Sequence, residues 1–110
     1  MANTFLLKTK DGSSTGATTD MTVYTVGAGK PTVIIGLTIA NVTAGSITVN
    51  ATIENNDGDN ISIGKNLPIP TGSSLDILAG KIVMEASDVL KVQSNTANAT
   101  SIALSIMEIS

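Results

Sequence analysis

Apolar and polar residues alternate with a period of two along most of the chain, and this pattern predicts β-strands. The alternation is cleanest in residues 47–54, where the apolar side chains occupy the odd positions. The segment 100–107 alternates in the same way, with isoleucine and leucine at positions 102, 104 and 106. No segment shows the sustained three- and four-residue apolar spacing of an amphipathic helix.

Turn residues divide these apolar segments at nearly regular intervals. Gly, Asn, Asp and Pro gather at 27–31 and 55–60, and small residues with a glycine occupy 43–46; such segments favour tight turns between strands. The pattern predicts about eight or nine short antiparallel strands. We therefore expect an all-β protein with a single β-sandwich, of jelly-roll or immunoglobulin-like type.

Two local pairings can be predicted from the turns. The segments 32–42 and 47–54 both alternate and are joined by a short turn, so we expect them to form a hairpin. Pro68 and Pro70 cannot donate backbone hydrogen bonds, which excludes a central strand at that point. The segment that contains them should be an edge strand or a crossing between sheets.

The first 20 residues differ from the rest of the chain. Phe5, Leu6 and Leu7 form a small apolar cluster, and residues 12–19 are small and polar, a composition typical of linkers. We expect an extended N-terminal arm or linker at 1–20 and a β-sandwich domain at 21–110. The arm either frays or docks its apolar cluster, Phe5 to Leu7, on a neighbouring subunit.

Two segments are partly apolar on both faces, namely 32–42 and the C-terminal strand. A sheet of a two-layer sandwich has one face toward the core, so a second apolar face indicates a subunit interface. The interface residues predicted on this basis are Val33, Ile34, Val42 and Met107. Central strands with small outward residues would produce a similar pattern. We expect a homo-oligomer.

Composition removes most catalytic chemistry. Among its 110 residues the chain has no Cys, His, Arg or Trp, whereas Ile, Val and Leu number 29 and Ser and Thr number 26. These absences remove the imidazole base, the thiolate and the guanidinium that grips phosphates. We predict no catalytic residues, no metal site and no cofactor, and hence a protein that is not an enzyme.

Charge and hydropathy exclude two further classes. The net charge of −3 comes with scattered lysines, so the cation cluster that nucleic-acid binding requires is missing. No apolar stretch approaches the roughly 20 residues that span a bilayer. The first residues also lack the apolar region of a signal peptide. We expect a protein made in the cytoplasm that contacts neither nucleic acid nor membrane.

Three short motifs resemble chemical sites. The sequence Gly27-Ala28-Gly29-Lys30-Pro31 lacks the outer glycine and the hydroxyl residue of a phosphate loop. Ser62 and Lys65 have the spacing of a Ser-x-x-Lys pair, but in an extended strand they should point to opposite faces. Asp57 and Asp59, in the turn after Glu54, could offer oxygen ligands to calcium, although they lack EF-hand spacing and favour a solvated turn.

A resemblance to a known family covers nearly the whole chain. It is carried by strand and turn patterns rather than chemical motifs, and the segments concerned are Met1–Phe5, Val23–Val26, Val33–Thr43, Ile47–Asn50, Leu67–Leu75 and Lys81–Glu85. In this order they resemble small virion structural proteins of tailed bacteriophages, especially those of cyanophages and other marine phages.

The resemblance implies a non-catalytic β-sandwich subunit present in many copies. Capsid decoration (cement) proteins of this size typically form trimers on the capsid lattice, so the implied partners are copies of itself and other phage structural proteins such as the major capsid protein. The implied location is the virion, assembled in the host bacterial cytoplasm. Neck, tail or fibre-associated ring proteins are the main alternative, and a lectin-like binding module is a further one.

Overall fold

The computed structural model describes residues 3–12, 16, 19–55, 57–76 and 82–109. Over these residues the chain forms β-strands and no helix. The strands are β1 (Asn3–Asp11), β2 (Met21–Thr25), β3 (Thr32–Asn41), β4 (Ile47–Glu54), β5 (Asn60–Ile69), β6 (Ser74–Asp76), β7 (Ile82–Met84), β8 (Val89–Ser94) and β9 (Thr100–Ile109).

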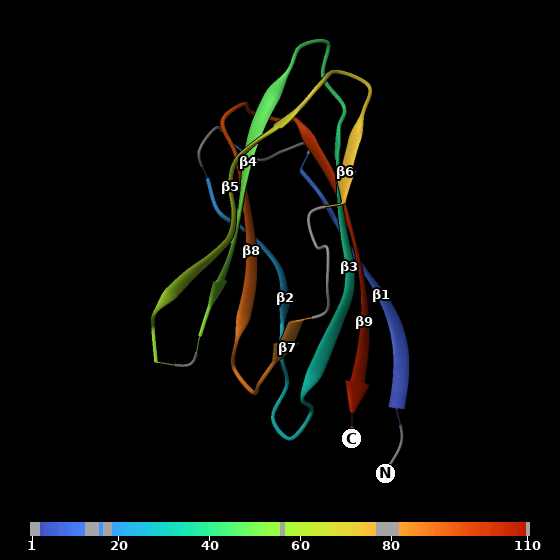
Figure 1. Cartoon of the computed structure of the whole chain (residues 1–110), viewed down its shortest axis with the longest axis vertical. Helices are drawn as coiled ribbons and strands as arrows, with labels where there is room; N and C mark the ends of the chain where they lie inside the picture. The colour runs from blue at the N-terminus through green and yellow to red at the C-terminus, as the bar shows by residue number, and fades with distance from the viewer. Residues whose placement is uncertain (1–2, 13–15, 17–18, 56, 77–81, 110) are drawn as a thin grey trace.

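The strands form two antiparallel sheets that pack face to face (Figure 1). The first, called sheet A here, has the order β1-β9-β3-β6. The short strands β6 and β7 both pair with β3. The second, sheet B, has the order β2-β8-β4-β5. The predicted all-β sandwich is therefore confirmed.

The structure corrects the expected N-terminal arm over much of its length. Residues 3–11 form β1, which pairs with β9 from Asn3–Ile109 to Asp11–Ser101. Gly12 then donates its N–H to the carbonyl of Thr100 at 2.8 Å. The backbone of this segment finds its hydrogen-bond partners in the C-terminal strand, which is distant in sequence. A boundary at residue 20 would therefore cut through sheet A.

The expected hairpin of 32–42 and 47–54 is wrong. β3 belongs to sheet A and β4 to sheet B, so the loop at 43–46 is an arch between the layers. A short turn between two half-buried strands suits either arrangement, and the pairing of β3 with β9 decides it. The expectation for the proline segment is confirmed, because β5 is the edge of sheet B and leads across to β6 in sheet A.

The core lies between the two sheets and is aliphatic. The odd positions of β4 and the even positions of β9 are buried in it, as the alternation predicts. In β3 the register with β9 shifts between Ile34 and Gly36, which marks a β-bulge. The bulge adds one residue, so Ile34 and Leu37 both face the core and are fully buried, while Ile35 is exposed.

Asn41, at the end of β3, joins the layers where the chain leaves sheet A. Its buried side-chain amide donates to the carbonyls of Gly45, at 2.7 Å, and Ile69, at 2.9 Å. Its oxygen accepts from the N–H and the hydroxyl of Thr43. One side chain thus closes the arch and holds it to the end of β5.

A second polar link joins the sheets near the chain termini. The hydroxyl of Tyr24, on β2, donates to the Glu108 carboxylate on β9 and lies 3.3 Å from the Thr32 hydroxyl. The Lys8 ammonium lies 6.0 Å from the centre of the Tyr24 ring. Burial is the main cause that raises the pKa of Tyr24, and the hydrogen bond to Glu108 raises it further.

We predict that Asn41→Ala lowers the free energy of unfolding by about 2–4 kcal/mol, because it leaves buried carbonyl and N–H groups without partners. Chemical denaturation followed by circular dichroism would measure the loss. The matched control is Asn55→Ala, since the Asn55 oxygen also accepts two backbone N–H groups, but in an exposed turn. Equal losses for the two variants would contradict the role of Asn41 in linking the layers.

The raised pKa of Tyr24 predicts a loss of stability at alkaline pH. The unfolded chain releases the phenolic proton near the usual pKa of about 10, whereas the folded chain retains it to higher pH. The stability that this phenol contributes should therefore be complete below a pH of about 10, and it should be lost as the pH rises from there through the higher pKa of the folded chain. Tyr24 is the chain's one tyrosine, so ultraviolet absorbance of the phenolate reports this group alone.

Tyr24→Phe should reduce the alkaline loss of stability, and Glu108→Gln should lower the pH at which the phenol of the folded chain ionises. A folded-state ionisation at or below the ordinary pKa of tyrosine would contradict the buried hydrogen bond.

Candidate interaction surfaces

The described residues contain neither a cluster of metal-ligating side chains nor a membrane-spanning helix. Within them, no three His, Cys, Asp or Glu side chains gather where they could hold a metal ion. The described residues also contain no helix that is long and apolar enough to cross a membrane. The turn considered for calcium is organised by Asn55, whose oxygen accepts the N–H groups of Asp57 and Asp59 at 3.0 and 2.9 Å. The candidate interaction surfaces are the outer faces of the two sheets.

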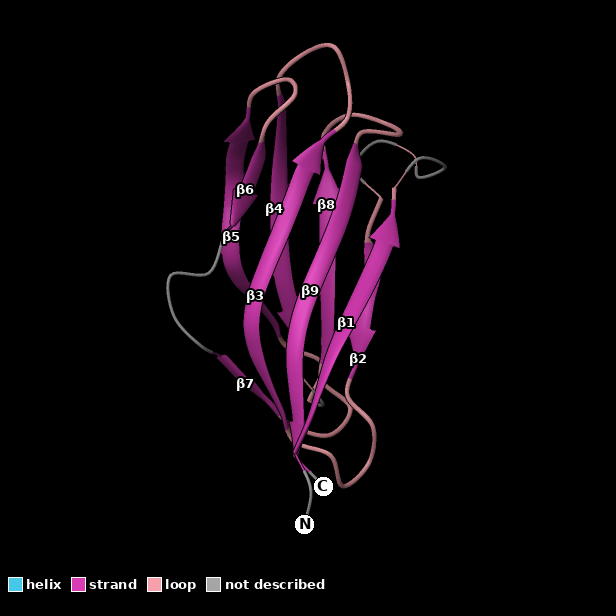
Figure 2. Ribbon diagram, turned by 90° about the vertical axis from the view of Figure 1, so that its right-hand side faces the viewer, coloured by secondary structure: helices cyan, strands magenta, loops and turns pink. Residues whose placement is uncertain are grey.

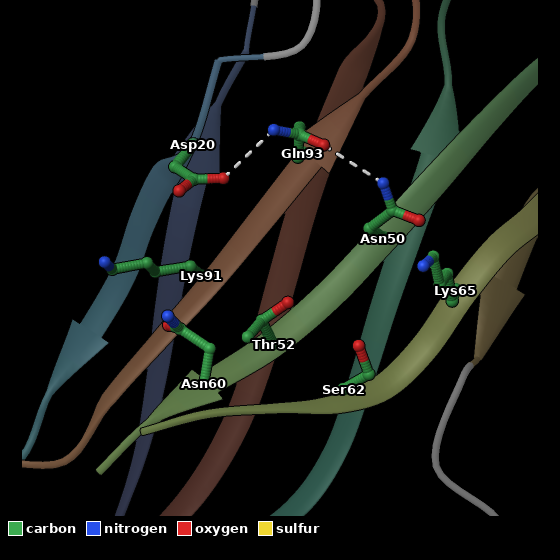
Figure 3. Close-up of a pocket in the computed structure, with 8 residues that line it drawn as sticks. All are labelled: Asp20, Asn50, Thr52, Asn60, Ser62, Lys65, Lys91 and Gln93. Carbon is green, nitrogen blue, oxygen red and sulfur yellow. Dashed lines mark hydrogen bonds between the residues drawn. The ribbon is translucent and has the colours of Figure 1, made fainter. Parts of the chain in front are cut away.

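The outer face of sheet B is polar. It contains a shallow hollow of about 300 Å³, which lies across β8, β4 and β5 (Figure 3). The hollow is lined by Asp20, Asn50, Thr52, Asn60, Ser62, Lys65, Lys91 and Gln93. On β4 and β8 these polar residues alternate with buried apolar ones, as expected of a sheet whose outer face meets water.

Many polar groups of this hollow are paired with one another. The Asn50 amide donates to the Gln93 oxygen at 3.0 Å, and the Gln93 amide donates to Asp20 at 3.2 Å. Lys91 forms an ion pair with Glu54 at 2.6 Å, and this hydrogen bond is the main cause that raises the pKa of Lys91. These side-chain hydrogen bonds and the ion pair connect neighbouring strands, as cross-strand polar pairs ordinarily do.

Ser62 and Lys65 line the same hollow, which corrects the expectation that they point to opposite faces. The pairing of β5 with β4 shifts register around Gly64, and Asn66 has a positive φ of 53°. These irregularities interrupt the strict alternation of a strand. Figure 3 draws no hydrogen bond between the two side chains.

The outer face of sheet A is different, because an apolar row crosses it from edge to edge. The strand register places Phe5 opposite Met107, Met107 opposite Val33, and Val33 opposite Val83. The row thus runs from β1 through β9 and β3 to β7, in the lower half of the sheet as Figure 2 shows it. Phe5 is 71% exposed and Val83 is 63% exposed.

Two further side chains extend this row. Leu7, on β1, is 64% exposed, and Ile35 is 41% exposed because the bulge in β3 turns it outward. We call the six residues the apolar patch: Phe5, Leu7, Val33, Ile35, Val83 and Met107. The register places no charged residue among them. A water-facing antiparallel sheet normally carries polar residues here, so the patch is a candidate interaction surface.

The other half of the same face is hollowed. Its central strands carry small side chains, with Ala103 between Thr9 and Thr38 in the register. The hollow has a volume of about 470 Å³, and its wall is mostly apolar. It is lined by Thr9, Lys10, Asp11, Thr38, Ala40, Ser101, Ile102 and Ala103.

The structure brings together four of the residues predicted to form an interface: Phe5, Leu7, Val33 and Met107 lie in the apolar patch. Leu6 instead faces inward and packs against the core.

The prediction for Ile34 is wrong, because the side chain is fully buried in the core. Its inward direction follows from the bulge that exposes Ile35 in its place. Val42 is exposed but follows the end of β3, at the other end of the sheet from Phe5.

Sequence reasoning missed Ile35 and Val83 as patch residues. A regular alternation through 32–42 would place Ile35 on the same face as Leu37 and Ile39, and the bulge that turns it outward leaves no signal in the residue pattern. Val83 is flanked by buried Met84 and half-buried Ile82 in a three-residue strand, which is too short for its alternation to be distinctive.

Comparisons with known proteins show the fold. No family model matches the chain, and no curated protein sequence matches it. A solved structure of Bacillus endospore appendages, described as a novel family of disulfide-linked pili, superposes with a TM-score of 0.59 at 13% identity, covering 99% of this chain and 87% of that one.

A chain in the structure of infectious bursal disease virus, Gx strain, superposes with a TM-score of 0.56 at 12% identity. The match covers 96% of this chain and 32% of the viral chain. At these identities the two likenesses establish a shared β-sandwich architecture.

Proposed function

We propose that this chain is a non-catalytic structural subunit of a bacteriophage virion, and specifically a capsid decoration (cement) protein. The observation that carries the proposal is the apolar patch on the outer face of sheet A. Sheet B presents paired polar side chains to solvent, whereas sheet A presents Phe5, Leu7 and Val83. A protein whose role is assembly needs such a covered face and needs no reactive group.

Burial of the patch would provide the assembly energy. At roughly 25 cal/mol per Å² of apolar surface, covering its exposed side chains contributes several kcal/mol per copy, before the cost of association is subtracted. Contributions of this size become large when many copies bind one lattice, because each bound copy raises the effective concentration of contacts for its neighbours.

The structural likenesses support an assembling subunit. Two of the solved structures that the chain resembles are those of a pilus and of a virus. The pilus is described as disulfide-linked, whereas this chain has no cysteine. Its own contacts would therefore be non-covalent, and the apolar patch is the surface suited to them.

The resemblance to tailed-phage virion proteins supports the placement in a virion. In that setting the subunit forms a homo-oligomer and contacts the major capsid protein. A neck, tail or fibre-associated ring protein would use the same surface. The number of copies per virion distinguishes a decoration protein from a ring protein. A decoration protein covers the whole head, whereas a ring protein is present only as the few copies of a single ring.

We predict that Phe5→Asp strongly reduces the number of copies on purified particles, because it places a charge within an apolar contact that becomes buried. The variant should still fold, since a charge on an exposed edge strand is well tolerated. Quantitative mass spectrometry of the particles measures occupancy. The matched control is Ile61→Asp, which removes an apolar side chain of similar exposure, 53%, from β5 on sheet B.

Full occupancy by the Phe5 variant would contradict the assignment of this face to particle attachment. A point substitution is preferable to deletion of residues 2–11, because the deletion would also remove β1 and its pairing with β9.

A further inference from the structure

The geometry points to a second copy of this chain as the molecule that covers the outer face of sheet A, docked face to face and turned end for end. The inference rests on the proposed function, because it uses the same apolar patch as an assembly surface. It adds the identity of the partner and the way in which the two faces meet.

The outer face of sheet A has two unlike halves. One half carries the bulky side chains of the apolar patch, and the other half is the hollow of about 470 Å³ with small residues at its centre. Phe5 and Thr9 represent the two halves on β1, four residues or roughly 13 Å apart. A surface with a projection and a hollow at this separation can be complementary to itself.

A two-fold axis running across the strands makes that complementarity explicit. If the axis follows the middle row Leu7–Ser105–Gly36, it exchanges the two halves of the face. Three residues of the patch then meet residues of the hollow on the other copy, whereas Leu7 lies on the axis and meets its own symmetry mate. The facing pairs are Phe5 with Thr9, Met107 with Ala103, and Val33 with Thr38.

The pairs Phe5 with Thr9 and Met107 with Ala103 set a large side chain against a smaller one, which is how packed layers interdigitate without voids. An axis parallel to the strands would instead set Met107 against Met107 and Ala103 against Ala103. That arrangement holds the sheets apart and leaves the hollow empty, and unfilled apolar space is destabilising. Packing therefore selects the end-for-end arrangement, which is a closed, isologous dimer.

The available area agrees with this partner. A stable interface of standard size uses roughly 800 Å² from each partner. The molecule extends 46 × 26 × 24 Å, and sheet A runs along its long dimension (Figure 2). A face of this extent provides area of the required order, with the apolar patch in one half and the hollow in the other.

The test uses the absence of cysteine from the chain. Ser105 lies on the proposed axis and is exposed in a single copy. Ser105→Cys therefore places one thiol beside its symmetry mate, and a short bis-maleimide should convert most of the protein to a covalent dimer. Ser62→Cys, an exposed serine on the outer face of sheet B, is the matched control and should stay uncrosslinked.

Analytical ultracentrifugation of the unmodified chain should show a dimer at micromolar concentration. Phe5→Asp should raise the dimer dissociation constant at least about a hundredfold, because each dimer contains the substitution twice. A monomer at tens of micromolar, or a dimer that Ser105→Cys fails to crosslink, would overturn the inference.

These outcomes are separable from the proposed function. If the chain is monomeric but Phe5→Asp is lost from particles, the patch binds another virion protein, and the self-association proposed here is wrong. If Ser105→Cys crosslinks but Phe5→Asp retains full particle occupancy, the dimer stands and the role of the patch in particle attachment is wrong.

Discussion

The antiparallel pairing of β9 with both β1 and β3 is the constraint on which the rest of the structure depends. This pairing joins the two ends of the chain and makes β9 a central strand of sheet A. It also fixes the register that sends Leu104 and Ile106 into the core. Because side chains alternate, the same register sends Ala103, Ser105 and Met107 outward. The core and the candidate interface are thus two consequences of one alignment, and a slip of one residue would exchange them.

The sequence predicted the faces of strands better than their partners. Burial alternates along β4, β8 and β9 as the residue pattern indicates, because the period of a strand is a local property. Partners depend on distant segments. The β3–β4 turn was compatible with a hairpin, and residues 3–11 resembled an arm because β9, their partner, lies about 100 residues away. Bulges are the other limit, since the register shift at Ile35 reverses which residues face outward.

The candidate site was predictable to the extent that it rested on composition. Phe5 and Leu7 stood out as apolar residues in a polar neighbourhood, and Met107 stood out as apolar on the outward side of an alternating strand. Their assembly into one row with Val33 and Val83 could not be derived from any of these segments alone. It requires the order of strands in sheet A, which brings the N-terminus, the C-terminus and the middle of the chain together.

The charges on β1 explain why assembly would use the face of sheet A rather than its edge. β1 pairs with β9 on one side only, and an open strand of this length could pair with the same edge of another copy. Lys8 alternates with Phe5 and Leu7 and takes the opposite side of the strand, where it lies over the Tyr24 ring. A lysine that points inward from an edge strand opposes edge-to-edge pairing. The apolar patch on the outer face contains no charge that would oppose association, so contact through this face is more favourable than contact through the edge of β1. This division favours a closed pair of faces over an open fibril joined through strand edges.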